Sequence, residues 1–138
     1  MSFITWQNYL ELDQDDEKDI AKLLIGRRVV AVDGADMMLD NGLHLTVIPN
    51  SGCCCGSGEY DIDYLNTVNN AITDVSVDSE YDENDYSRTI YTVYVIANGI
   101  KIQLIGVSGT DGNGYYGTGF KIECKVSDME ALGMEVPR

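Results

Sequence analysis

Two glycine-rich segments carry the residue types best suited to binding chemistry. The cysteine segment, residues 52–60, holds three consecutive cysteines, and the tyrosine segment, residues 108–119, holds two adjacent tyrosines. Thiolates ligate metals or act as nucleophiles, and tyrosines on loops anchor ligands and protein partners. We therefore predict that the two segments lie close together and form the working surface of the protein. Its candidate residues are Tyr115, Tyr116, Asn113, Asp111, Cys53, Cys54, Cys55 and Tyr60.

A zinc site is one chemistry that the cysteines suggest. Cys124 and the only histidine, His44, would have to complete the ligand set. Structural zinc sites usually separate paired ligands by two to four residues, and the side chains of adjacent residues point apart. A reactive thiol is disfavoured because no basic residue lies nearby in the sequence to lower a thiol pKa. We predict buried thiols and no metal or other cofactor; a bound metal would use Cys53, Cys55 and Cys124 first.

The tyrosine segment matches neither of the two ion-binding patterns that its composition suggests. No lysine follows its glycines, and a strand rather than a helix is predicted next, which argues against a phosphate-binding loop. Asp111 and Asn113 resemble the start of a calcium loop, but the glutamate that completes such a loop is missing. We interpret the segment as an ordered loop whose tyrosines either bind a partner or fill the end of the core.

Catalytic chemistry has little support in the sequence. His44 alternates with Leu43 and Leu45 in a predicted strand, so it is expected on the exposed face, opposite the leucines. The chain has no nucleophile-elbow motif, and no carboxylate pair can be assigned acid and base roles from spacing alone. We therefore favour a binding protein over an enzyme.

Charge narrows the classes of partner. The chain has 23 acidic and 9 basic residues, a net charge of −14, and no Lys or Arg lies between Arg28 and Arg88. Such a field repels nucleic-acid phosphates and anionic membranes. No apolar run approaches the ~20 residues of a membrane span, and the N-terminus lacks the features of a signal peptide. We expect an intracellular protein that binds no nucleic acid directly and no membrane, with the acidic run 78–85 either solvated or facing cations or a basic partner.

Hydrophobic periodicity predicts the fold. The mainly β (α+β) pattern indicates an antiparallel meander of six or seven strands that forms a small sandwich or partly open barrel, with a short helix near each terminus. Asn41-Gly42 and Asn98-Gly99 each separate apolar runs, which predicts two-residue type I′ hairpin turns. A single domain is expected, divided into an N-terminal arm (1–12), a helix (13–26), a β-body (27–126) and a C-terminal tail (127–138) opened by a capping box at Ser127 to Glu130.

The two segments and their surroundings resemble a known family. The stretches that carry the resemblance are NSGCCCGSGEY at 50–60, NNAIT at 69–73, DGNGYYGTG at 111–119, LIGRRVV at 24–30 and LDNG at 39–42. They are similar to small proteins of unknown function encoded mainly by bacteriophages of actinobacteria, over residues 23–126. The cysteines of such proteins are spaced by glycines, whereas here they are adjacent, which is a further argument against a metal site. The resemblance implies a phage origin and no agreed activity.

These observations lead to three hypotheses for function. The first is a non-enzymatic bacteriophage accessory protein that binds a host protein in the host cytoplasm, with an acidic surface that imitates nucleic acid. The second is a protein that binds and sequesters a small ligand such as a nucleotide signal, which would require Arg27, Arg28, Arg88 or Lys101 to gather near the site. The third is a minor structural component of the virion.

Overall fold

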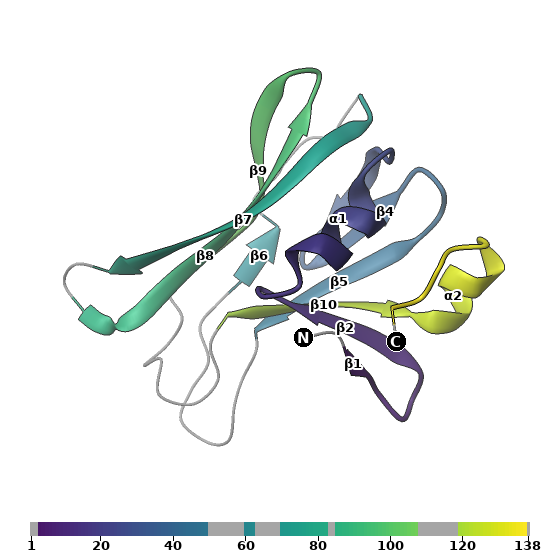
Figure 1. Ribbon diagram of the computed structural model, residues 1–138, viewed down its shortest axis with the longest axis horizontal. Coiled ribbons are helices and arrows are strands. Elements are labelled where there is room, and N and C mark those ends of the chain that lie inside the picture. Colours follow the sequence, from purple (N-terminus) through teal and green to yellow (C-terminus); the bar gives the residue numbers. More distant parts are fainter. Residues whose placement is uncertain (1–2, 50–59, 63–69, 83–84, 108–118, 138) are drawn as a thin grey trace.

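The computed structural model describes residues 3–49, 60–62, 70–82, 85–107 and 119–137, which form two antiparallel sheets and two short helices (Figure 1). The first sheet has the order β1-β2-β10-β5-β4-β3. Its strands are β1 (Phe3–Ile4), β2 (Tyr9–Asp13), β3 (Val29–Asp33), β4 (Asp36–Leu39), β5 (His44–Pro49) and β10 (Phe120–Lys125). The second sheet has the order β6-β9-β8-β7. Its strands are β6 (Tyr60–Ile62), β7 (Ile72–Asp82), β8 (Asp85–Ala97) and β9 (Ile100–Val107). No helix of the described residues is long and apolar enough to cross a membrane.

The predicted fold class is confirmed: the protein is mainly β and antiparallel, and the sheets formed by the described residues do not close into a barrel. The strands of the described residues number ten rather than six or seven. Two meanders, β3-β4-β5 and β7-β8-β9, follow the chain, as expected for strands joined by short turns. β10 departs from the meander because it inserts between β2 and β5, and this insertion joins the two ends of the chain to the first sheet.

The core is one cluster of buried side chains. Both sheets contribute to it, as do both helices, α1 (Glu17–Leu24) and α2 (Val126–Ala131). Strand alternation supplies it, since successive side chains point to opposite faces. In β10, for example, Phe120, Ile122 and Cys124 are buried while the residues between them are partly exposed. α1 lies between β7 and the first sheet (Figure 1), and its buried stripe of Ile20, Leu23 and Leu24 closes that side.

The two ends of α1 lie at an aspartate and a glycine. Asp16 occupies the N-cap position of α1, but its carboxylate accepts a hydrogen bond from the backbone N–H of Asp13 at 2.9 Å instead of capping the helix. The helix is therefore shorter than the predicted range 13–26. Gly26, with φ of 84°, ends it in the left-handed conformation that glycine adopts without strain.

Both terminal segments differ from their predicted form. Residues 1–12 were expected as an N-terminal arm, yet β1 and β2 form a hairpin that pairs with β10. The predicted capping box at Ser127 is wrong, because α2 already begins at Val126 and has no side-chain cap. The backbone N–H of Val126 instead donates to the carbonyl of Asn8, at 3.0 Å, in the β1–β2 turn. A tertiary contact thus replaces the local cap.

The two Asn-Gly pairs form different turns. Asn98 and Gly99 have φ of 53° and 74° and join directly paired Ala97 and Ile100, which confirms the two-residue type I′ turn. At the other site only Gly42 has positive φ, and its N–H donates to the carbonyl of Leu39 at 2.9 Å. Because Leu39 also bonds to Leu43 across the turn, this hairpin has a three-residue loop, and the two-residue prediction is wrong here.

Most of the acidic run 78–85 belongs to strands, since β7 extends to Asp82 and β8 begins at Asp85. β7 is an edge strand, and carboxylates occupy part of its free edge. Glu17 of α1 accepts the N–H of Val77 at 2.8 Å, and Asp74 accepts the N–H of Val75 at 2.9 Å. Side-chain capping of this kind protects an exposed edge from pairing with another chain.

Candidate functional site

The predicted working surface lies almost wholly outside the described residues. Cys53, Cys54, Cys55, Asp111, Asn113, Tyr115 and Tyr116 all fall there. Tyr60 is the first residue of β6, where its Cα pairs with that of Val107 in β9. The idea that these residues form one surface stays a prediction.

Cys124, the one cysteine among the described residues, is buried in the core. Its Sγ lies 3.5 Å from Sδ of Met129 in α2. Burial of the thiol, and then the nearby negative charge of Asp128, raises the pKa of Cys124 from 9.0 to about 11. A protonated thiol in this position packs as a small apolar group. Within the part of the chain that the structure describes, no three His, Cys, Asp or Glu side chains are arranged to hold a metal ion.

His44 lies on the exposed face of β5, as the alternation with Leu43 and Leu45 predicts. Its Nε2 is 3.6 Å from a carboxylate oxygen of Asp36, and the Thr46 hydroxyl donates to that same oxygen at 2.7 Å. About half of each of the His44 and Asp36 side chains is exposed, so the pair is a surface contact of small energetic weight.

Two carboxyl groups face each other on the outer face of the first sheet. Glu11 of β2 and Glu123 of β10 are cross-strand partners. Burial is the main cause that raises the pKa of Glu123, and a hydrogen bond with Glu11 and the negative charge of Glu11 add to it. The positive charge of Lys121, whose Nζ lies 3.6 Å from Glu11, opposes this rise in the pKa of Glu123.

The outer face of the second sheet carries a hollow of about 470 Å³. Asp78 and Glu80 of β7 line one side of it, and Thr92 and Tyr94 of β8 line the other. Asp78 and Thr92 are directly opposed in the ladder. An aromatic ring beside carboxylates is a suitable surface for a cationic group, since both attract positive charge.

A positively charged side chain of the protein itself already contacts two residues of this hollow. The ammonium of Lys101, from β9, lies 4.2 Å from the centroid of the Tyr94 ring and 3.7 Å from a carboxylate oxygen of Asp78. More than half of each of the Lys101 and Asp78 side chains is exposed to solvent. The contact is therefore open and exchangeable rather than part of the core. Glu80 has no ion pair within the described residues and remains available.

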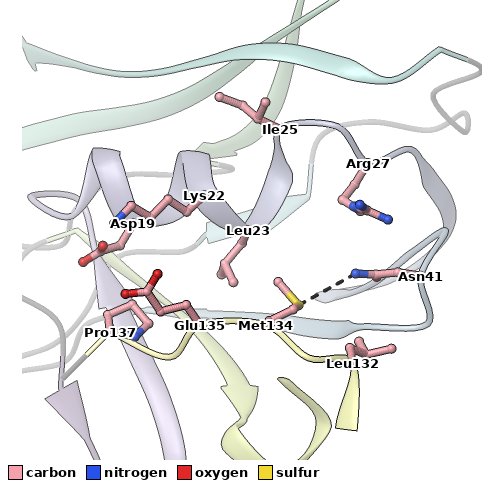
Figure 2. Close-up of a pocket in the computed structure, with 10 residues that line it drawn as sticks. All are labelled: Asp19, Lys22, Leu23, Ile25, Arg27, Asn41, Leu132, Met134, Glu135 and Pro137. Atoms are coloured by element: carbon pink, nitrogen blue, oxygen red, sulfur yellow. Dashed lines mark hydrogen bonds between the residues drawn. The ribbon is translucent and has the colours of Figure 1, made fainter. Parts of the chain in front are cut away.

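A second concave site was not predicted from the sequence. This groove, of about 500 Å³, is bounded by α1, the β4–β5 turn and the C-terminal stretch 132–137 (Figure 2). A signal for it was present: Lys18, Lys22, Arg27 and Arg28 make up four of the nine basic residues of this acidic chain. Of these, Lys22 and Arg27 line the groove. Only the tertiary structure brings the C-terminal stretch beside them, because the two segments are more than a hundred residues apart.

Comparisons with known proteins place the chain in a family but attach no activity to it. Neither the curated proteins nor the solved structures include a match to the chain. The family model of a domain of unknown function, DUF7448, matches residues 22–122. The match runs from the last turn of α1 into β10, so it covers all residues that line the hollow and only part of the groove. Because residues 22–122 make up most of the chain, the protein belongs to the DUF7448 family.

Proposed function

We propose that this chain is a non-enzymatic binding protein that captures a basic segment of another protein on the outer face of its four-stranded sheet. The observation that carries the proposal is the position of Lys101, whose ammonium rests between the Tyr94 ring and the Asp78 carboxylate. An ammonium or guanidinium from a partner would meet the same two groups, and Glu80 beside them offers a second carboxylate.

The arrangement of acids on β7 also supports imitation of nucleic acid. Asp74, Asp78 and Glu80 are exposed residues at even-numbered positions of one strand. Alternate residues of a strand are separated by ~6.8 Å, so Asp78 and Glu80 are about that far apart and Asp74 is about twice as far from Asp78. A basic protein that follows a phosphate backbone would find a row of negative charge here.

The resemblance to actinobacterial bacteriophage proteins supplies the biological setting of the proposal. In that setting the partner is a basic host protein met in the host cytoplasm, and the chain acts as a phage accessory protein. A protein with a net charge of −14 attracts such a partner over long range and accelerates the encounter.

Titration with an octalysine peptide whose C-terminus is amidated tests the proposal, with binding followed by calorimetry at 50 and 500 mM NaCl. The double variant Asp78→Asn/Glu80→Gln should bind about tenfold more weakly than the parent at low salt, because exposed charge contacts contribute up to ~1 kcal/mol each. The control Asp15→Asn/Asp33→Asn removes two exposed charges elsewhere and should have a smaller effect. Equal losses in both variants would mean that only net charge matters and would refute this site.

The Tyr94→Leu variant tests the aromatic part of the site. Loss of the ring should weaken octalysine binding but leave the net charge of the protein unchanged. The affinity should therefore fall with rising salt concentration as steeply as it does for the parent. An unchanged affinity would exclude Tyr94 from the binding surface.

A further inference from the structure

The groove beside α1 combines charged and apolar side chains. Leu23, from α1, is almost wholly buried beneath it, and Met134 of the C-terminal stretch packs against the same core. The backbone N–H of Met134 donates to the carbonyl of Met129 at 2.9 Å, which holds the stretch close to α2. The groove therefore has an apolar floor held by hydrogen bonds and core packing.

Charged groups of opposite sign occupy the two ends of the groove. Figure 2 shows the carboxyl groups of Asp19 and Glu135 at one end and the side chains of Arg27 and Asn41 at the other, with Leu23 and Met134 between them. Lys22 lies at the acidic end and points toward Asp19, three residues before it on the helix. Two carboxylates and one ammonium leave that end with a net negative charge.

The end groups are weakly engaged within the protein. The guanidinium of Arg27 lies 3.8 Å from Asp40, and 42% of its side chain is exposed. The amide nitrogen of Asn41 donates to Sδ of Met134 at 3.8 Å, and thioether sulfur is a weak acceptor. Glu135 forms no hydrogen bond or ion pair with the rest of the described chain. Both ends can therefore exchange present contacts for stronger ones with a ligand.

We propose that this groove binds a zwitterion whose ammonium and carboxylate are separated by an aliphatic chain, as in a lysine at the C-terminus of a peptide. The ammonium faces Asp19 and Glu135, the methylenes cover Leu23 and Met134, and the carboxylate meets Arg27 and the amide of Asn41. Charge complementarity selects this occupant: a simple anion would leave the acidic end unpaired, and a simple cation would leave Arg27 without a new partner. The groove is separate from the hollow on the outer face of the second sheet, and this proposal does not depend on the function proposed for that hollow.

The direct test is titration of the whole chain with 6-aminohexanoate, followed by backbone NMR shifts and calorimetry, with hexanoate and hexylamine as matched probes. We expect shifts confined to α1, the β4–β5 turn and residues 132–137, and an affinity at least about tenfold above that of either single-charge probe. Equal binding of hexanoate or of hexylamine would overturn the proposal in favour of a simple anion or cation site. Absence of binding by 6-aminohexanoate would overturn it outright.

Variants at the two ends supply the second test. Arg27→Met keeps the aliphatic stem and removes the charge, and Glu135→Gln removes a carboxylate of equal size; each should reduce 6-aminohexanoate affinity about tenfold. Lys18→Met removes an exposed charge from the same helix outside the groove and should leave the affinity unchanged. A peptide ending in lysine should bind and its C-terminal amide should not. Asp78→Asn/Glu80→Gln should bind the zwitterion like the parent, so failure of one site is distinguishable from failure of the other.

Discussion

Phe120 of β10 lies directly opposite Pro49 of β5 in the ladder that joins the two strands. Val107 of β9 is paired in the same way with Tyr60 of β6. One stretch of chain runs from Pro49 to Tyr60 and another runs from Val107 to Phe120. The two stretches therefore begin and end at neighbouring positions. The cysteine and tyrosine segments are attached to the fold at the same two places, which is the attachment that a shared working surface requires.

The first prediction concerns that surface. Replacement of Tyr115 and Tyr116 by Ala should reduce capture of the host partner, while the melting temperature stays within about 2 °C of the parent. Tyrosine side chains that serve a partner contribute little to folding. A fall in unfolding free energy of about 3–5 kcal/mol would instead identify them as core residues and end the hypothesis.

The second prediction concerns Gly119, which lies just before β10. Its φ is 80°, and a Cβ at this position would collide with the side-chain amide of Gln14. The colliding atoms are the far end of a flexible side chain that can rotate away. Gly119→Ala should therefore cost the ~1–2 kcal/mol of a left-handed alanine and a small additional amount for moving Gln14, measured by urea unfolding.

Gly34 provides the matched control for this change, since it has φ of 61° and open space around the added Cβ. Gly34→Ala should show the backbone cost alone. Adding Gln14→Ala to Gly119→Ala should recover the excess. Equal losses for the two glycine variants would contradict a steric role for Gln14.

The third prediction uses the carboxyl pair of Glu123 and Glu11. Because the folded-state pKa of Glu123 is raised, the unfolded chain ionises first as pH rises. The stability from this group is fully present below the ordinary pKa of 4.5 and is lost as pH rises through the folded value. Glu123→Gln stays neutral and can still donate to Glu11, so it should raise the melting temperature at pH 7 and change it little at pH 4.

Glu80→Gln is the control for Glu123→Gln, since it makes the same chemical change at an exposed position of β7. A gain of equal size in both variants would show that relief of the overall negative charge, and not the carboxyl pair, is responsible. A loss of stability at pH 7 in Glu123→Gln alone would show that an ionised Glu123 is required.

The fourth prediction concerns Cys124, whose folded pKa is about 11. In a variant with Cys53, Cys54 and Cys55 replaced by Ser, iodoacetamide at pH 8 should modify Cys124 only as fast as the chain unfolds, since the thiolate is the reactive form. Modification in minutes under native conditions would show an accessible thiol.

The same thiol makes stability depend on alkaline pH. The unfolded thiol ionises near pH 9 and the folded one near 11, so the stability from this group is complete below pH 9 and is lost as pH rises through 11. The loss is at most about 3 kcal/mol. The Cys124→Ala variant should not show this loss of stability between pH 9 and pH 11. Identical alkaline unfolding profiles for the variant and the parent would contradict the prediction.

Local sequence patterns were sufficient for much of the fold. The apolar stripe of α1, the stop at Gly26 and the turn at Asn98-Gly99 all depend on residues within a few positions of each other. His44 was correctly predicted as exposed because strand alternation with Leu43 and Leu45 is also local. These features follow from backbone geometry and side-chain periodicity, which short stretches of chain carry by themselves.

Other features were decided by contacts between distant segments. The start of α2 depends on the carbonyl of Asn8, and the insertion of β10 between β2 and β5 depends on pairing with strands far away in the sequence. The Lys101 site and the groove beside α1 likewise combine residues from separate strands or from opposite ends of the chain. The sequence by itself determined which residues could face a core or a turn. Only the tertiary structure decided which of them meet, because strand order and long-range pairing are properties of the whole chain's packing.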